Sequence, residues 1–267
     1  MAMQKDYRKY KTAFISAVLM IVIIGFFAEY VVAQDAPNYV MYETQYLTVK
    51  PGHFEALSEK LSEHNKRFHA EGPRTAFVLY ILNGARTGDL FWVMGPTTFA
   101  DLDTRPKGEP HDGDWLNEVL SHCEKAYNTE YWVRNDELSY LPANMDQDAR
   151  ELSRARFFEV ADNALFEKVQ GQIKKVIEAM GSKQPRTMYR KRFMHRDGRD
   201  WAAVSGFKNW SEFDEEGASF EATFKNVHGD EAWNTFTKEF DEAVVSREDE
   251  WRQHVPEMDG AGTDSDE

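Results

Sequence analysis

The chain has 267 residues, enough for one large domain or for two domains of about 100–120 residues each. It is 42% hydrophobic and 13% aromatic, so it is globular rather than disordered. The net charge is −14, and the chain after its first 33 residues holds 28 basic and 44 acidic side chains, a net charge of −16. Because phosphate backbones and anionic lipid surfaces repel so acidic a protein, no binding to nucleic acid is expected.

Residues 1–33 have the pattern of an export signal. A basic stretch from Lys5 to Lys11 precedes an apolar run from Thr12 to Ala28, and Val31 and Ala33 suit the −3 and −1 positions of a cleavage site. The alternative is a retained membrane anchor, since the 17-residue run approaches the length that spans a bilayer, about 17–25 residues. Both interpretations place the folded part outside the cytoplasm, periplasmic or extracellular. Membrane contact is expected only through this segment, if it is uncleaved.

The next part of the chain reads as strands and helices of ordinary length. Residues 39–48 alternate in polarity as a strand does, and apolar residues from Phe54 to Phe68 recur at helical spacing. The predicted elements of this first half are strand 39–48, helix 54–68, strand 75–82, strand 90–94, helix 115–127 and strand 131–133. The single cysteine, Cys123, lies on the apolar stripe of the last helix, so it is expected to be a small buried hydrophobic residue.

The second half repeats this order. Its predicted elements are strand 154–160, a helix capped by Asn163 and reaching Met180, strand 187–194, strand 201–207, a helix from Trp233 to Val244 and strand 251–255. The triplet Pro73-Arg74-Thr75 recurs 112 positions later as Pro185-Arg186-Thr187, and Gly95 recurs 111 positions later as Gly206. The predicted domains are a first repeat at 38–141, a linker at 142–150, a second repeat at 151–257 and a disordered acidic tail at 258–267.

Each repeat has the β-α-β-β-α-β order of ferredoxin-like units. Such a unit covers one face of its antiparallel sheet with helices and leaves the other face for another element to bury. Two units in one chain can bury these open faces against each other, and sheet aromatics such as Tyr80, Trp92 and Trp201 suit such an interface. We therefore predict an α+β fold in which two tandem ferredoxin-like repeats pack sheet to sheet, with a cavity between the sheets.

The junction between the first strand and helix, Val49-Lys50-Pro51-Gly52-His53-Phe54, resembles that of the dimeric α+β barrel superfamily, which includes antibiotic-biosynthesis monooxygenase-like and NIPSNAP-like proteins. The second repeat departs from this pattern, with Ala161-Asp162-Asn163-Ala164-Leu165-Phe166 at the equivalent place. Over residues 38–257, the resemblance implies an intramolecular version of the dimeric barrel, as a monomer or homodimer. It also implies an inter-sheet pocket for a small aromatic or hydrophobic molecule, and in some members haem binding or degradation.

Basic residues at strand spacing are the most unusual feature of the second repeat. Arg154 and Arg156 share one face of a predicted strand, and Arg190 and Arg192 share one face of the next. If these faces line a pocket, four guanidinium groups converge on an anionic ligand. The alternative is that the four arginines pair with the abundant carboxylates or lie on an exposed strand edge.

Polar and aromatic residues on strands of the first repeat form a second candidate site. Glu43 and Gln45 share a strand face, and Tyr80 and Trp92 are candidate ligand-binding residues on neighbouring strands. A carboxylate among aromatic rings has a raised pKa and can act as a base, so Glu43 is a candidate catalytic residue. The alternative is a solvated strand face. His254, near a strand end, is the other candidate catalytic residue.

No metal and no built-in cofactor are predicted. His64 and His69 are five positions apart on the predicted helix and do not share a face, and the acidic loop 109–114 reads as solvated. A haem site would need a pocket histidine, with His195 and His254 as candidates. The chain lacks a glycine-rich phosphate loop, a Gly-x-Ser-x-Gly elbow and a His-Glu-x-x-His motif.

The leading hypothesis is an exported protein that binds a small hydrophobic or anionic molecule in the inter-sheet cavity. The first alternative is a cofactor-independent monooxygenase or isomerase of the barrel superfamily. The second alternative is a structural or interaction protein in which side chains fill the cavity.

Overall fold

A computed structural model describes residues 39–143, 151–214 and 217–261. The predicted export segment, most of the predicted linker and residues 262–267 of the predicted tail lie outside these ranges. Within them, none of the helices combines the length and the apolar character needed to cross a membrane.

The first half, residues 39–143, contains most of the elements that were predicted for it. These are β1 (Met41–Val49), α2 (Phe54–Phe68), η1 (Gly72–Arg74), β2 (Ala76–Ile81), β3 (Leu90–Thr97), α3 (Phe99–Asp103), α4 (His111–Asp114), η2 (Trp115–Val119), η3 (Leu120–His122), β4 (Cys123–Ala126) and β5 (Glu130–Tyr140). The predicted helix 115–127 is wrong at its C-terminal end, because the helical turns stop at His122 and Cys123 begins a strand that pairs with β1. Cys123 is still buried, and burial raises the pKa of its thiol to about 11.

The second half, residues 151–261, follows a similar order. It contains β6 (Leu152–Val160), α5 (Asn163–Ala179), β7 (Arg186–Lys191), β8 (Trp201–Phe207), η4 (Trp210–Phe213), α6 (Phe220–His228), α7 (Ala232–Ala243), β9 (Val244–His254) and η5 (Pro256–Met258). The sequence pattern did not predict α6 or most of β9. Met258 and Asp259 were predicted to lie in a disordered tail, whereas both are buried and the Met258 carbonyl accepts a hydrogen bond from Asn65 of α2 at 2.7 Å.

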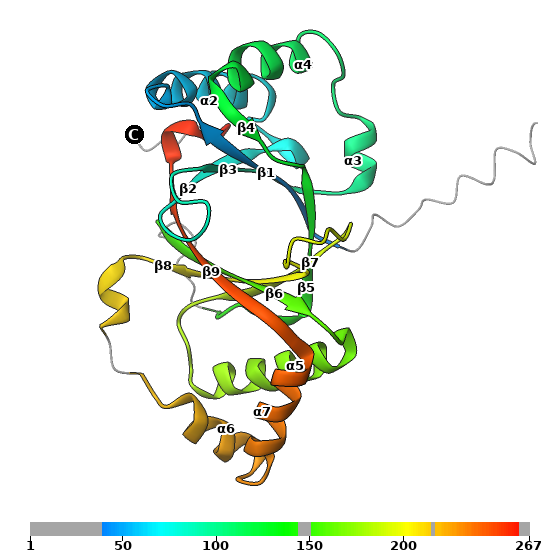
Figure 1. Cartoon of the computed structure of the whole chain (residues 1–267), viewed down its shortest axis with the longest axis vertical. Helices are drawn as coiled ribbons and strands as arrows, with labels where there is room; N and C mark the ends of the chain where they lie inside the picture. Colours follow the sequence, from blue (N-terminus) through cyan, green and yellow to red (C-terminus); the bar gives the residue numbers. More distant parts are fainter. Residues whose placement is uncertain (1–38, 144–150, 215–216, 262–267) are drawn as a thin grey trace, which may run out of the picture. The chain divides into compact units, whose positions relative to one another are not determined.

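Eight strands close into one antiparallel barrel (Figure 1). The ladders run in the order β3-β2-β9-β6-β8-β7-β5-β1, and β1 pairs with β3 to complete the ring, while β4 pairs only with the end of β1. Each half contributes four strands in ferredoxin-like order. The halves meet at two seams, β2 with β9 and β5 with β7. The predicted α+β fold and the intramolecular barrel are therefore confirmed.

Alternation along the strands divides side chains between the barrel interior and the outer, helix-covered face. On β1, Tyr46 packs inside with Phe91, whereas Leu47 packs outside against Leu57 of α2. On β6, Phe157 packs inside with Trp132, and outward-facing Phe158 lies against α5. Each half therefore buries side chains in two places: in the barrel interior, and in the layer between its sheet and its helices.

Aromatic and charged side chains from both halves fill the barrel interior. Tyr46 Oη donates to Glu250 at 3.0 Å and accepts from Arg252 at 3.0 Å, and Arg199 binds Glu130. The charged members are Glu130, Lys191, Asp197, Arg199, Glu250 and Arg252. Burial raises the pKa of Tyr46 well above its ordinary value, although the charge of Arg252 opposes this. Because Tyr46 and Glu130 belong to the first half and their partners to the second, this network ties the halves together.

Candidate ligand-binding site

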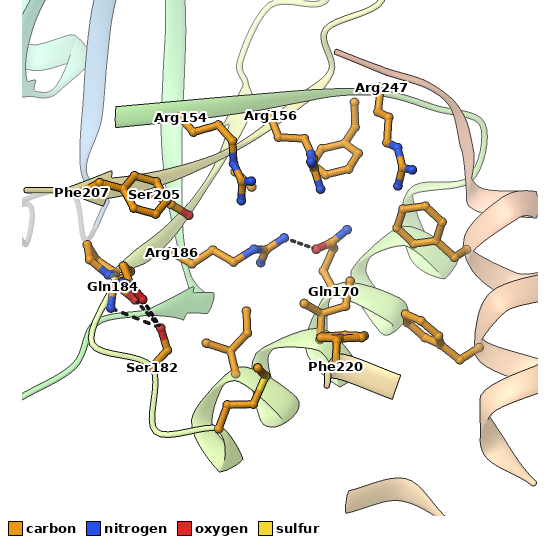
Figure 2. Close-up of a pocket in the computed structure, with 18 of the residues that line it drawn as sticks. Arg154, Arg156, Gln170, Ser182, Gln184, Arg186, Ser205, Phe207, Phe220 and Arg247 are labelled. Atoms are coloured by element: carbon orange, nitrogen blue, oxygen red, sulfur yellow. Dashed lines mark hydrogen bonds between the residues drawn. The ribbon is translucent and has the colours of Figure 1, made fainter. Parts of the chain in front are cut away.

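A cavity of about 540 Å³ lies in the second half between the sheet and helices α5, α6 and α7 (Figure 2). We call it the arginine cavity. Its apolar lining residues are Phe158, Ile173, Ile177, Met180, Pro185, Ala203, Phe207, Phe220, Phe236 and Phe240. Its polar lining residues are Arg154, Arg156, Gln170, Ser182, Gln184, Arg186, Ser205, Thr237, Asp241 and Arg247. The expected cavity position was between the two half-sheets; this cavity lies on the helix side instead.

The strand pattern explains why arginines line this space. Arg154 and Arg156 share the outward face of β6 with Phe158, whose ring lies 5.2 Å from that of Phe166 on α5. On the adjacent strand β8, the outward positions Ala203 and Ser205 pair with Arg156 and Arg154. These two short side chains leave the volume into which the long arginine side chains extend.

Arg186, at the start of β7, lies at the centre of the group in Figure 2. Its Nη2 donates to Oε1 of Gln170 at 2.6 Å, but its Nη1 is buried and has no hydrogen-bond partner among the described residues. Nε2 of Gln170 is likewise buried without a partner there. Burial first, then repulsion from Arg156 and Arg154, lowers the pKa of Arg186 to about 10. The group thus stays charged near neutral pH without a carboxylate partner.

The other arginines differ in how they are neutralised. Arg156 forms two hydrogen bonds of 2.6 Å with Asp249 of β9. Arg154 has no hydrogen bond or ion pair within the described ranges and lies 5.8 Å from the Trp251 ring centre. Burial lowers the pKa of Arg154, and the charge of Arg156 adds to the shift. With Arg247 also in the lining, positive charge exceeds negative charge around this cavity.

Comparison with known proteins agrees with the architecture. No protein-family model matches the chain, and a search of curated proteins finds no match. An anthrone oxidase-like protein aligns with a TM-score of 0.53 at 12% identity, over 84% of this chain and 93% of that chain. The "putative monooxygenase" of Fusobacterium nucleatum subsp. nucleatum ATCC 25586 aligns with a TM-score of 0.50 at 9% identity, over 82% of this chain and 94% of that chain. At these identities the similarity concerns the fold alone.

This chain has the dimeric α+β barrel fold. Both half-sheets of the barrel lie within one polypeptide, and the arginine cavity belongs entirely to the second half.

The barrel brings two of the predicted ligand-binding residues, Arg154 and Arg156, into the arginine cavity. Arg190 shares a β7 face with Arg186 but is exposed and lies 3.8 Å from Glu167, as the ion-pair alternative expects. Arg192 follows β7 and is exposed, and its backbone N–H donates to the Tyr131 carbonyl. The four predicted arginines therefore do not converge.

The other predicted site residues lie away from this cavity. Trp92 is buried in the core, where its Nε1 donates to Oδ1 of Asn65 at 2.9 Å. Tyr80 packs edge-on against Phe54, with ring centres 6.0 Å apart. The remaining two candidates are held in ion pairs: buried Glu43 with Arg105, and His254 with Asp259 at 2.8 Å.

The cavity residues were tested against a haem group, which the superfamily resemblance raised. Haem iron is held by a histidine, a cysteine thiolate or a tyrosine, with methionine as a second ligand beside histidine; Met180 lines the arginine cavity, but no histidine, cysteine or tyrosine does. His195 lies in an exposed loop and His254 binds Asp259. The residues present do not fit haem, and we derive no haem chemistry for this site.

Sequence reasoning missed Arg186, Gln170 and Arg247. Arg186 is part of the repeated Pro-Arg-Thr triplet, which served only as a marker of the repeat. Its spacing of four from Arg190 places both on one strand face and was a usable signal. The helix residue Gln170 offered none, because its role depends on which strand side chain lies opposite.

Proposed function

We propose that the arginine cavity binds a small organic anion with an apolar body. The observation that carries this proposal is the buried Nη1 of Arg186, a cationic donor without a partner in the described structure. Leaving a buried donor unpaired costs about 1–3 kcal/mol, so a ligand that accepts this hydrogen bond recovers that cost. Carboxylate is the group whose planar oxygen pair matches the guanidinium fork.

The rest of the lining supports the same ligand class. A volume of about 540 Å³ suits a small molecule, and the phenylalanine, isoleucine and methionine walls favour an aromatic or aliphatic body. The unpaired Nε2 of Gln170 is a second donor beside Arg186. Arg154 adds positive charge that no carboxylate of the described structure pairs with. An anionic head group and an apolar body thus each have a place in the cavity.

The test compares cinnamate with cinnamyl alcohol, which share a body and differ in charge. We expect calorimetry to show tighter binding of cinnamate, and Arg186→Met to weaken it by roughly tenfold or more, an effect of about 1.4 kcal/mol. The alcohol should bind both proteins alike. Arg190→Met is the matched control, since Arg190 shares the strand face but lies outside the cavity. Equal binding of the two compounds, or undiminished cinnamate binding by Arg186→Met, would overturn the proposal.

Cofactor-independent oxidation, an alternative that the sequence raised, is the second candidate function, and the names of the two structural neighbours point to oxidation. The observation that favours it is Asp241, an acidic lining residue able to remove a proton from a bound substrate before oxygen reacts. Oxygen uptake with anthrone as substrate should exceed the rate in buffer and fall in Asp241→Asn. No rate above buffer would eliminate this candidate.

We also propose that the protein acts after export, on the pattern of residues 1–33. Cell fractionation and N-terminal sequencing test this. A mature protein that begins at Gln34 supports cleavage, membrane retention supports the anchor, and a cytoplasmic full-length chain contradicts both.

A further inference from the structure

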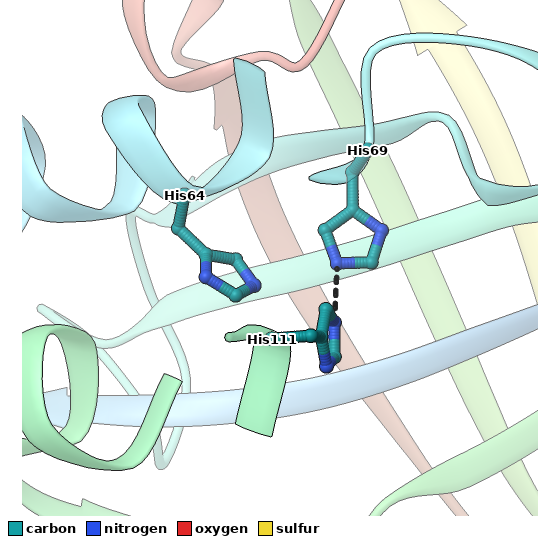
Figure 3. Close-up of side chains that lie close together, drawn as sticks. All are labelled: His64, His69 and His111. Carbon is teal, nitrogen blue, oxygen red and sulfur yellow. Dashed lines mark hydrogen bonds between the residues drawn. The ribbon is translucent and has the colours of Figure 1, made fainter. Parts of the chain in front are cut away.

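Three histidines converge in the first half (Figure 3). His64 lies on α2, His69 follows that helix, and His111 begins α4. One ring nitrogen from each lies within 4.8 Å of those from the other two, and the Nε2 atoms of His69 and His111 are 3.3 Å apart. His64 and His69 are buried, and the His111 side chain is 12% exposed.

Each imidazole is held through its Nδ1. The partners are Asp114 Oδ1 for His64 at 2.6 Å, the Arg74 carbonyl for His69 at 2.9 Å and Asp112 Oδ1 for His111 at 2.9 Å. Carboxylate and carbonyl oxygens accept hydrogen bonds and do not donate them, so each Nδ1 carries a proton. In the neutral imidazole, Nε2 then holds the lone pair. All three rings therefore have the same tautomer, with Nε2 free to act as a ligand.

Two features of the cluster favour a bound cation. Nε2 of His64 is buried without a hydrogen-bond partner among the described residues. The Nε2 lone pairs of His69 and His111 face each other across 3.3 Å, and only a shared proton or a metal ion makes that contact attractive.

We propose that His64, His69 and His111 bind a divalent first-row transition-metal ion, zinc being the one that suits three neutral imidazoles. Nitrogens at a zinc distance of about 2.0–2.1 Å in tetrahedral geometry are themselves about 3.3–3.4 Å apart. The separation of 3.3 Å between His69 and His111 matches this edge. Metal-bound histidines usually donate their other N–H to a carboxylate or carbonyl, the arrangement in all three rings here. Three protein ligands leave the fourth position to water.

Aromatic side chains surround the cluster and provide a readout. The ring centre of His64 lies 5.0 Å from those of Phe68 and Trp115, and His69 lies 5.3 Å from Trp92. A paramagnetic ion bound by the histidines would sit next to two tryptophans and quench their fluorescence. The site would also join α4 to α2, two helices that β2, β3 and α3 separate in the sequence.

The test uses tag-free, chelator-treated protein and the metal alone. We expect one equivalent of Zn²⁺ by calorimetry, and Co²⁺ should give the visible absorption of a tetrahedral site with tryptophan quenching. His69→Gln and His111→Gln should both lose stoichiometric binding. Asp114→Asn, which alters only the group that orients His64, should weaken binding by about 10–100-fold.

His122→Gln is the matched control. His53 and His122 form another histidine pair in the same half, with Nδ1 atoms 3.0 Å apart, and metal binding should survive this change. His111→Gln is the safer variant for folding, because His69 is buried, and near-ultraviolet circular dichroism checks both variants. Absence of stoichiometric binding by the unaltered protein, or binding undiminished in His111→Gln, overturns the proposal. Cinnamate binding in the second half should be the same in all of these variants, so the two proposals fail separately.

Discussion

The two halves of the barrel share a strand order but fill the layer between sheet and helices differently. In the first half, Trp92 pairs with Gln45 and Val78, and Met94 pairs with Glu43 and Ala76. At the equivalent rungs of the second half, Ala203 pairs with Arg156 and Met188, and Ser205 pairs with Arg154 and Arg186. Two large side chains on the central strand are thus replaced by two small ones, and three neighbouring positions become arginine.

This difference shows how one scaffold yields a packed layer and a hollow one. Trp92 and Met94 are buried in the core of the first half, together with Val255 and Met258 from the end of the chain. In the second half, α6 and α7 pack their aromatic residues mainly on one another and on α5, as the Phe224 and Phe236 rings 4.5 Å apart illustrate. The space left above Ala203 and Ser205 is the arginine cavity. Side-chain volume on β3 and β8 therefore decides which half has a cavity.

Removing the largest side chain of the packed layer should have the largest effect. Trp92→Ala deletes a buried ring and its hydrogen bond to Asn65, so we expect urea denaturation of chelator-treated protein to show a loss of about 3–5 kcal/mol. Trp210→Ala is the control, because Trp210 is 54% exposed and should cost about 1 kcal/mol or less. Similar losses for both variants would mean that the first half is no more tightly packed than the surface.

Filling the hollow layer should abolish its ligand binding. Ser205→Met restores the residue found at the equivalent rung of β3, and we expect cinnamate to bind roughly tenfold more weakly, or not measurably, while unfolding changes by about 1–3 kcal/mol. Val245→Met, at a position that is 61% exposed, should leave both quantities unchanged. Retained binding in Ser205→Met would place the ligand outside the cavity.

The ion pair between Arg156 and Asp249 should make the stability of the second half depend on pH. Burial alone raises the pKa of Asp249, but the hydrogen bond and charge of Arg156, with Arg154 and Arg247, outweigh it and lower the pKa. A lowered carboxyl pKa stabilises the fold above the unfolded value of about 3.9, and the contribution disappears as pH falls through the folded value. Because both side chains are 34% exposed, we expect Asp249→Asn to cost about 1 kcal/mol near neutral pH.

The measurement is denaturant unfolding of the unaltered protein and Asp249→Asn across a pH series. The difference between their free energies of unfolding should stay constant from neutral pH down to about pH 5 and disappear below about pH 4. Asp136→Asn removes a carboxylate that is 62% exposed beside Arg134, so its free energy of unfolding should differ less from that of the unaltered protein. A difference in unfolding free energy that grows as pH falls would contradict the lowered pKa of Asp249.

Replacing Arg154, which has no ion-pair partner in the described structure, should change the stability least, and should raise it rather than lower it. The lowered pKa of Arg154 means that the folded protein disfavours its charge, so Arg154→Met should stabilise by about 0.5 kcal/mol in urea denaturation, while weakening cinnamate binding. Arg192→Met, in the exposed loop, should change neither quantity. Destabilisation by more than about 1 kcal/mol would indicate a stabilising partner for Arg154.

Much of the fold could be predicted from the sequence because it depends on local periodicity. The alternation at 39–48 and the apolar stripe at 54–68 correspond to β1 and α2, and the predicted strand 201–207 has the same bounds as β8. The same alternation placed Arg154 and Arg156 on one strand face. The extent of β5 and β9 was missed, because the residues of β5 beyond Val133 pair with β7 and the first residues of β9 pair with β6, in both cases with a strand far away in sequence.

Tertiary structure decided the sites. Alternation separates the two faces of β6 but does not say which face meets helices, and so it could not place the cavity on the helix side. The histidine cluster was missed for a related reason: α2 ends at Phe68, so helical spacing does not apply to His69, and His111, at the start of α4, lies 42 residues from His69 in the sequence. By itself, the sequence determined most of the strands and helices and their order in each half, which follow from short-range patterns. Which distant side chains meet depends on packing at long range, and only the closed barrel settles that.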